Sequence, residues 1–224
     1  MTDPGTSRKD SAARDRGDEV SVSPDPEFSA ASQRDPAARR IASEVLQLLE
    51  NSARQEYFGE AVSQLSHALQ CAALAVEAGA DEELILAALL HDIGHLLETP
   101  AARREAQIGV INHDAIGERW LRERGFSPRL AALVGGHVAA KRYLTAVNPQ
   151  YRDRLSPASR ATLALQGGPM EPSAVAEFAA GTALRDLLRL RSWDEQAKDP
   201  GWQGPGLEAY REMLIRHLAQ ERPA

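Results

Sequence analysis

Residues 87–98, AALLHDIGHLLE, place three ionisable side chains in an otherwise apolar stretch. His91 and His95 are four positions apart, so a helix through this stretch would carry both imidazoles on one face. Asp92 would lie about 100° further around the helix axis, given the 3.6-residue period. Burying three such groups costs free energy unless they share a partner, and imidazole and carboxylate are both metal ligands. The stretch therefore predicts a buried helix that presents a metal site.

The other histidines strengthen this interpretation. The chain holds six histidines, and five of them fall between residues 67 and 137. A lone histidine on an apolar helix is more often a hydrogen-bonded core residue than a ligand, and we interpret His217 as structural or exposed. Five together favour a metal, although a buried His–Asp hydrogen bond beside an unrelated histidine remains the alternative at 91–95. The clustered histidines are His67, His91, His95, His113 and His137.

After Pro36, apolar residues recur at three- and four-residue spacings along most of the chain. Asp81 is a candidate N-cap, and Glu82 and Glu83 favour the positive end of the helix that follows it. β-Branched residues do not alternate over five or more positions, so strands are not expected. The sequence therefore predicts an all-α fold. The expected helices span residues 37–51, 62–78, 82–97, 101–107, 113–124, 128–147, 157–165, 172–191 and 206–219.

The first 35 residues are rich in Pro, Ser, Asp, Arg and Gly and poor in large apolar side chains. Such a segment buries too little apolar surface to offset its ordering entropy, so we expect a disordered tail at 1–35. The rest of the chain, 36–224, has the length of one ordinary domain. We therefore expect a single helical domain there.

Composition narrows the class of protein further. The 224 residues include 26 basic and 32 acidic side chains, and a net charge of −6 argues against a nucleic-acid partner. Cys71 is the single cysteine, which excludes a disulfide framework and favours a small buried hydrophobe. No segment approaches the roughly 18 apolar residues of a membrane span, and no signal-peptide core is visible. These features favour a cytoplasmic protein without a membrane partner.

The order of the candidate ligands resembles a known superfamily. His67, then His91-Asp92, then a late aspartate are similar to the H…HD…D signature of HD-domain proteins, a helical metal-binding fold. An HD dipeptide alone is a weak signal, but HDIGH after a helix rich in alanine and leucine is specific. The resemblance implies an HD-domain helical bundle with a dinuclear metal site at its centre. Most members of the superfamily are phosphohydrolases.

Further motifs resemble a narrower group, the HD-domain oxygenases that cleave carbon–phosphorus bonds, typified by the glycine-forming 2-amino-1-hydroxyethylphosphonate dioxygenases. The resemblance covers residues 41–198. It implies that an Fe(II)/Fe(III) pair binds a 1-hydroxyphosphonate and uses O2 to form phosphate and a carboxylic acid. The motifs are YFGEAVSQLSHALQCA at 57–72, HDIGH at 91–95, NHDAIGERWL at 112–121, GHVAAKRYL at 136–144, LSPASRATLALQGGPM at 155–170 and RSWDEQAK at 191–198.

Carried over position by position, the resemblance implies a role for each matching residue. Tyr57 would occupy an open position on the second iron until substrate displaces it, and Glu60 would receive the substrate's amino group. The first iron would be held by His67, His91, Asp92 and Asp194, and the second by Asp92, His113 and His137. The phosphonate oxygens would be held by His95, Lys141, Ser159 and Arg191.

Some of these residues have simpler explanations. His137 and Lys141 are four apart and would share a helix face, but spacing alone leaves a solvated lysine equally open. Tyr57 could be a core aromatic residue, and Glu60 an acid near a helix N-terminus. Gly59, between them, favours a mobile and tightly turning loop.

Two other functions stay open. The same ligands could hold two divalent metals that generate hydroxide in an HD phosphohydrolase acting on a phosphate ester or nucleotide. A non-catalytic HD domain that senses a ligand is the third class. Iron together with O2 consumption separates the oxygenase from the phosphohydrolase. The expected partners are a small organophosphonate and O2, whereas the substituent on the substrate and the oligomeric state are not determined by the sequence.

Overall fold

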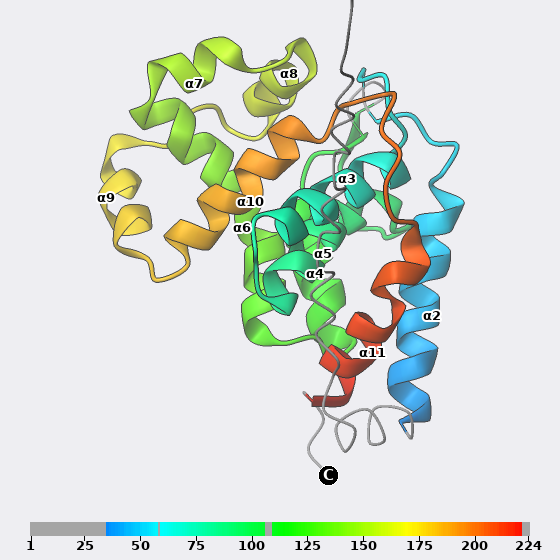
Figure 1. The fold of residues 1–224 in the computed structure, drawn as a ribbon. Helices are drawn as coiled ribbons and strands as arrows, with labels where there is room; N and C mark the ends of the chain where they lie inside the picture. Colours follow the sequence, from blue (N-terminus) through cyan, green and yellow to red (C-terminus); the bar gives the residue numbers. More distant parts are fainter. Residues whose placement is uncertain (1–34, 58, 106–108, 221–224) are drawn as a thin grey trace, which may run out of the picture.

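The structure, a computed structural model, describes residues 35–57, 59–105 and 109–220. Nearly all regular structure in these ranges is helical, which confirms the predicted all-α class (Figure 1). The tail expected at 1–35 lies outside the described residues except for Asp35, whose side chain caps the first described helix. The elements are α2 (Pro36–Asn51), α3 (Gln64–Glu77), α4 (Glu82–Leu90), η1 (Ile93–Leu96), β1 (Arg104–Glu105), β2 (Gly109–Val110), α5 (His113–Glu123), α6 (Pro128–Val147), α7 (Pro149–Arg154), α8 (Pro157–Leu165), α9 (Pro172–Ala180), α10 (Leu184–Gln196), η2 (Leu207–Tyr210) and α11 (Arg211–Gln220).

Helix α4 lies at the centre of the bundle. Every residue from Leu84 to Leu90 is buried, as expected for a helix that is apolar on all sides. Helices α3, α6, α10 and α11 all pack against it, and α5 packs against α6 and η1. The C-terminal end of α4 therefore opens into the middle of the protein, where polar side chains can meet only one another or a ligand.

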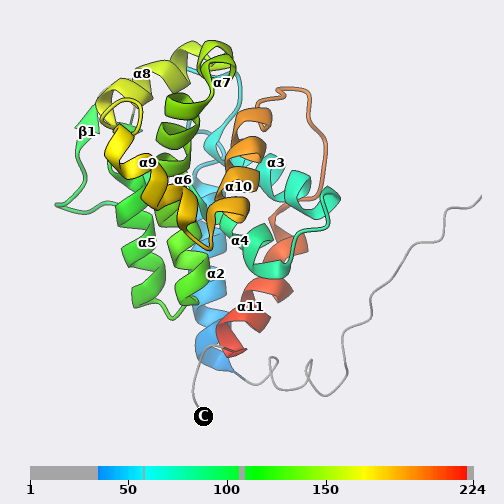
Figure 2. The ribbon, with the colours of Figure 1, turned by 90° about the vertical axis from the view of Figure 1, so that its left-hand side faces the viewer.

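The remaining helices cover two ends of this centre. Helices α2 and α11 lie side by side, while α7, α8 and α9 lie together at the opposite end (Figures 1 and 2). Two of the described helices, α6 and α8, begin with a serine cap followed by proline, whose missing N–H costs nothing in the first turn. The Ser127 side chain accepts a hydrogen bond from Leu130 N–H, and Ser156 does the same for Ser159 N–H.

The prediction of a single helix over 82–97 is wrong for the second half of that range. Helix α4 ends at Leu90, and a 3₁₀ turn, η1, follows after Asp92, whose φ of −100° and ψ of 10° leave the α-helical region. Its carbonyl accepts a hydrogen bond from His95 N–H, three residues on. His91 and His95 therefore do not share the face of one α-helix, and each joins different neighbours.

Two other expected helices differ from the structure. Part of 101–107 forms strand β1, which pairs with β2 in an antiparallel hairpin, and residues 106–108 lie outside the described part. Helix 172–191 is divided into α9 and α10, because Gly181 has an extended ψ of 138°. The short helix α7 was not predicted. It starts after Asn148, whose side chain accepts a hydrogen bond from Tyr151 N–H.

In the described part of the chain, no helix combines the length and apolar character that a bilayer crossing requires.

Candidate metal centre and substrate pocket

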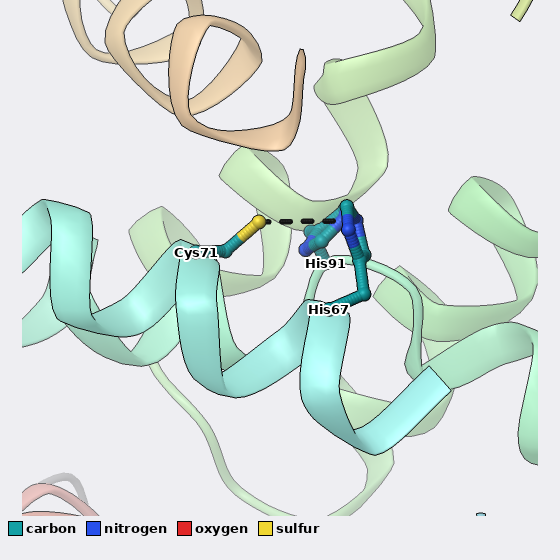
Figure 3. A group of neighbouring side chains, drawn as sticks. All are labelled: His67, Cys71 and His91. Carbon is teal, nitrogen blue, oxygen red and sulfur yellow. Dashed lines mark hydrogen bonds between the residues drawn. The ribbon is translucent and has the colours of Figure 1, made fainter. Parts of the chain in front are cut away.

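Three helices bring predicted ligands into one buried cluster, which we call the first group: His67, His91 and Asp194. His67 lies in α3, His91 follows the last residue of α4, and Asp194 lies in α10. The His67 Nε2 atom is 3.2 Å from His91 Nε2 and 3.4 Å from Asp194 Oδ1. Figure 3 shows the two imidazoles meeting, with Cys71 beside them from the next turn of α3. Each member of the group is at most 3% exposed.

The second group consists of His113 and His137. His113 begins α5, His137 lies in α6, and their Nε2 atoms are 2.9 Å apart. Close packing of η1 on α5 places His113 here. Gly94 of η1 allows this packing, because a Cβ at that position would collide with the backbone carbonyl of His113.

Asp92 lies between the two groups and offers one carboxylate oxygen to each. Its Oδ2 atom is 3.3 Å from His91 Nε2 and 3.8 Å from His67 Nε2. Its Oδ1 atom is 3.2 Å from His113 Nε2 and 3.5 Å from His137 Nε2. The carboxylate thus bridges the two groups, one oxygen toward each.

Backbone carbonyls determine which nitrogen of each ligand histidine carries the proton. A carbonyl oxygen only accepts hydrogen bonds, so a ring Nδ1 beside one must be protonated, and the neutral ring then has its lone pair on Nε2. This is the usual arrangement around metal-binding histidines. The Nδ1 atoms of His67, His91, His113 and His137 donate to the carbonyls of Ala197, Ala88, Val110 and Val134, at 2.8, 2.9, 2.9 and 2.7 Å.

The donor set fits a metal ion in each group. Two nitrogens bound at right angles to one ion, each at about 2.1 Å, lie about 3.0 Å apart. The Nε2 atoms are 3.2 Å apart in the first group and 2.9 Å apart in the second. Lone pairs that meet at such distances repel unless a cation or a proton lies between them. The neighbouring carboxylates supply the negative charge that a cation requires.

The pKa shifts of the cluster also favour a bound cation. Burial raises the pKa of the Asp92 carboxyl, but His91 and hydrogen bonds from the other imidazoles outweigh it and hold that pKa well below its usual range. Burial also raises the pKa of the Asp194 carboxyl, but the Arg191 guanidinium outweighs this effect. The pKa of Asp194 therefore lies well below its usual range. Burial lowers the pKa of His91, yet Asp92 outweighs this and raises it to about 9. Without a metal, a proton on His91 therefore balances part of the negative charge of Asp92 and Asp194.

Cys71 lies within reach of the first group but differs from its ligands. The sulfur atom is 3.8 Å from His67 Nε2, and the side chain is fully buried. Burial raises the pKa of this thiol well above its ordinary value, with Asp194 adding to the effect. The thiolate, which is the form that binds metals, is therefore strongly disfavoured. The expectation of a small buried side chain is confirmed.

His95 has the opposite tautomer to the ligand histidines. Its Nδ1 atom accepts a hydrogen bond from Val110 N–H at 3.1 Å, so the proton of the neutral ring is on Nε2. Burial lowers its pKa well below the ordinary value, with His113 adding to the effect, which keeps the ring neutral. The ring stacks on His113, with centroids 3.9 Å apart. His95 is therefore suited to donate a hydrogen bond to an anion.

Tyr57 and Glu60 belong to one tight turn between α2 and α3. Glu60 N–H donates to the Tyr57 carbonyl at 2.8 Å, and Tyr57 N–H donates to the Val62 carbonyl at 2.9 Å. Gly59 has a φ of +81°, a conformation that other residues rarely adopt, and Phe58 lies outside the described residues. The turn thus presents two polar side chains to the same pocket.

Tyr57 contacts the first group, although the sequence analysis assigned it to the second. Its ring stacks on His67 with centroids 3.8 Å apart, and its hydroxyl oxygen is 3.5 Å from Asp194 Oδ1. Burial raises the pKa of this phenol well above its ordinary value, and Asp92 and Asp194 add to the effect. A cation in the first group would oppose that shift, because it would favour the phenolate.

A pocket partly lined by α8 lies over both groups. His67 and His91 stand behind it, and both are fully buried. The other predicted site residues line its wall: Tyr57, Glu60, Asp92, His95, His113, His137, Lys141, Ser159, Arg191 and Asp194.

The cationic residues of the pocket have different partners. Lys141 is 4% exposed and donates to Thr162 Oγ1 at 3.0 Å. Arg191 is bound on three sides, since its guanidinium pairs with Asp194 and Glu195 and its Nε–H donates to the Tyr151 hydroxyl. Arg191 therefore orients Asp194, whereas the hydrogen bond of Lys141 is to a neutral hydroxyl.

Several pocket residues were missed in the sequence analysis. Thr162 and Gln166 line the wall beside Ser159, and Gln166 Oε1 is buried without a hydrogen-bond partner in the described part of the chain. Thr162 is three residues and Gln166 seven residues after Ser159, a spacing that could have placed all three on one face of α8 and its C-cap. Lys198, which pairs with Glu60, was quoted within a motif without being given a role.

Comparison with known proteins relates this arrangement to one family. Residues 65–169 match the model of the HD domain. The chain is 38% identical over 169 residues to the 1-hydroxy-2-(trimethylamino)ethylphosphonate dioxygenase (glycine-betaine-forming) of Leisingera caerulea. The aligned region covers 72% of this chain and 82% of that protein.

Two further relatives have similar coverage. The hydroxymethylphosphonate dioxygenase of Gimesia maris is 40% identical over 178 residues, or 73% of this chain and 83% of that protein. An uncharacterized protein of Acanthamoeba polyphaga mimivirus is 37% identical over 177 residues, or 79% of this chain and 81% of that protein. The HD-domain range contains His67, His91, Asp92, His113, His137 and helix α8, whereas Asp194 lies beyond it.

Proposed function

This chain belongs to the family of HD-domain phosphonate dioxygenases, and we propose that it cleaves the carbon–phosphorus bond of a 1-hydroxyphosphonate with O2. The products are inorganic phosphate and a carboxylic acid. Written as R–CH(OH)–PO₃²⁻ + O2 → R–COOH + HPO₄²⁻, the reaction balances in atoms and charge. It therefore requires no external reductant, because both oxygen atoms of O2 enter the products.

The position of Asp92 is the observation that carries this proposal. One of its oxygens is next to the first group and the other is next to the second, as a carboxylate shared by two ions requires. Imidazole and carboxylate ligands without a thiolate suit iron in oxygen chemistry. The proposed ligands are His67, His91, Asp92 and Asp194 for one iron, and Asp92, His113 and His137 for the other.

When bound, the iron pair would supply O2 activation and accept electrons from the substrate. The protein's own residues would orient the phosphonate beside it. His95 would donate its Nε2–H to a phosphonate oxygen, since its Nδ1 is held by Val110 N–H. Lys141 would add a compact positive charge from the α6 side. Ser159 and Arg191 also line the wall and would complete the phosphonate site.

Tyr57 would protect the centre before substrate binds. Its hydroxyl lies beside Asp194, so we assign the position that it covers to the first iron. Substrate would displace this hydroxyl, and the turn that holds Tyr57 also holds Glu60 at the pocket wall. Binding at Glu60 and release of Tyr57 would therefore be linked through one short segment.

The substituent on the substrate is the finer part of the proposal. Glu60 could receive an ammonium, so the sequence favours 2-amino-1-hydroxyethylphosphonate, with glycine as product. The named relatives act on a trimethylammonium compound and on hydroxymethylphosphonate. An assay of the three compounds side by side distinguishes these candidates.

The test is a stoichiometry. The full chain, purified with iron, is given each 1-hydroxyphosphonate, and phosphate release is followed together with O2 uptake. We expect about one phosphate for each O2, as the balance above requires, and no phosphate without O2. Phosphate release from p-nitrophenyl phosphate with Mn²⁺ or Co²⁺, equal in air and under nitrogen, would instead support the phosphohydrolase. The Asp92→Asn variant serves as the inactive control.

A further inference from the structure

The carboxylate of Glu60 already has a counter-ion. Lys198 Nζ lies 2.9 Å from Glu60 Oε1, and the Ser156 hydroxyl donates to the same oxygen at 2.7 Å. Burial raises the pKa of Glu60, but the hydrogen bonds from Ser156 and Lys198 outweigh it and lower that pKa below its ordinary value. Glu60 is therefore an ionised group whose charge is met from within the protein.

Lys198 occupies this position from behind the pocket wall. Glu60 and Ser159 line the pocket, and Lys198 Nζ is 3.4 Å from the Ser159 hydroxyl. A second carboxylate, Glu195, lies 3.7 Å from the same ammonium. Lys198 also follows Ala197, whose carbonyl accepts the hydrogen bond from His67 Nδ1. The segment that carries Lys198 therefore also orients His67, a candidate metal ligand.

The pairing changes what this end of the pocket can recognise. A carboxylate without a partner would attract an ammonium on the substrate, which is the argument for an amine-bearing compound. With Lys198 in place, a substrate ammonium at Glu60 would lie next to a second ammonium. The attraction to Glu60 and the repulsion from Lys198 then largely cancel, and the cation still loses its hydration.

We propose that Lys198 is a specificity-determining residue, which pairs with Glu60 so that the pocket favours 1-hydroxyphosphonates with an uncharged substituent over those with an ammonium. The inference rests on the proposed function, because it names the substrate class of that same site. Lys198 does not touch the substrate in this scheme. It acts through the charge of Glu60.

The experiment compares two substrates of nearly the same shape. 1-Hydroxypropylphosphonate carries a methyl group where 2-amino-1-hydroxyethylphosphonate carries an ammonium. The measured quantity is the ratio of kcat/KM for the uncharged compound to kcat/KM for the ammonium compound. We expect a ratio of at least about tenfold in the unmodified protein, and a fall of at least about tenfold in Lys198→Met. Lys198→Arg should keep the original ratio, because it restores the charge.

Two further variants keep the test decisive. Glu60→Gln leaves Lys198 without its partner and should raise the ratio further, which can be measured even if Lys198→Met does not fold. Arg185→Met removes an exposed cation from α10 and should change nothing. Iron content and melting temperature are recorded for every variant, so that loss of folding is not mistaken for loss of selectivity.

The outcomes separate this inference from the proposed function. An unmodified protein that prefers the ammonium compound, or a ratio within about twofold of the original in both Lys198→Met and Glu60→Gln, overturns the role of Lys198 while leaving the dioxygenase intact. No O2-dependent phosphate release from any 1-hydroxyphosphonate overturns the proposed function itself.

Discussion

His113 and His137 bring their Nε2 atoms within 2.9 Å of each other, while each ring donates its Nδ1–H to a backbone carbonyl. Neither nitrogen can donate to the other when both rings are neutral, so the contact is unfavourable unless a cation joins it. Val110 and Val134, which supply the carbonyls, hold the rings in this orientation. The pair therefore links metal binding to the stability of the fold.

Removal of the metal should lower the melting temperature. A ligand present at 100 times its Kd adds about 2.7 kcal/mol to the free energy of unfolding, and each kcal/mol shifts Tm by about 2–4 °C in a chain of this size. We expect chelated protein to melt about 5–10 °C below the iron-loaded protein, as measured by calorimetry. Addition of Fe²⁺ should restore the difference, and equal melting temperatures would contradict a structural role for the metal.

The two aspartates of the centre should differ in metal content. Asp194 belongs to the first group alone, so Asp194→Asn should lose one of the two irons. Asp92 contacts both groups, and Asp92→Asn should weaken both sites. Iron per chain, measured by elemental analysis, distinguishes these outcomes, with Asp153→Asn on the surface of α7 as the control. Retention of two irons in Asp194→Asn refutes its assignment as a ligand.

Replacing Tyr57 by Phe should affect the substrate-free state. The ring stack on His67 is kept, and only the hydroxyl beside Asp194 is removed. We expect unchanged iron content but an altered optical spectrum before substrate is added. Tyr143 lies on α6, where its ring contacts Phe178 of α9, and Tyr143→Phe is the matched control that should leave the spectrum as it is. An unchanged spectrum in Tyr57→Phe would exclude the phenol from the iron.

Lys141 should make substrate binding sensitive to pH. Burial lowers its pKa to about 7, with Arg191 adding to the effect. The ammonium that attracts the phosphonate is the form present below this pKa. We therefore expect kcat/KM to fall about tenfold per pH unit above pH 7. Lys141→Arg keeps its charge and should remove this fall, whereas a flat profile in the unmodified protein would exclude the role.

The same lysine predicts a trend in stability. In the unfolded chain its pKa is about 10.4, so between pH 7 and 10 the unfolded state binds more protons than the folded state. The contribution of Lys141 to the free energy of unfolding therefore rises with pH across this window, and is least favourable below pH 7. Chemical denaturation of the unmodified protein and of Lys141→Met at pH 6.5 and 9 measures the difference.

Gly94→Ala tests the packing that places His113. A Cβ at Gly94 would collide with the carbonyl of His113, so η1 and α5 would have to separate. We expect a loss of about 1–3 kcal/mol in the free energy of unfolding and weaker metal binding in the second group. Gly206→Ala is the matched control, because a Cβ there meets nothing and the backbone is extended. Equal stability of the two variants would contradict this explanation.

Much of the fold could be predicted from sequence patterns. The apolar spacings after Pro36 and the candidate cap Asp81 are local signals, and helices α2 and α4 follow them in the structure. The break after Leu90 could not be predicted in this way. It depends on the contact between Gly94 and His113, which comes from a segment about 20 residues further along the chain.

The hairpin of β1 and β2 was missed for a related reason. The alanines and charged residues around 101–107 favour a helix locally, whereas the antiparallel pairing places Val110 N–H against His95 Nδ1. That hydrogen bond decides the tautomer of His95 and hence its chemistry. Short strands of two residues leave too little alternation in the sequence to be recognised.

The identities of the candidate ligands were determined by the sequence, since histidine and aspartate at these positions carry their chemistry wherever the chain places them. Only the tertiary structure decided which nitrogen of His67 faces inward, because the carbonyl that holds this ring belongs to Ala197, 130 residues away. His91, His113 and His137 each donate to the carbonyl three residues earlier, which is a local contact. It also decided that Glu60 meets Lys198 before any substrate does. Charges and hydrogen bonds act through space, and distant segments become neighbours only when the chain has folded.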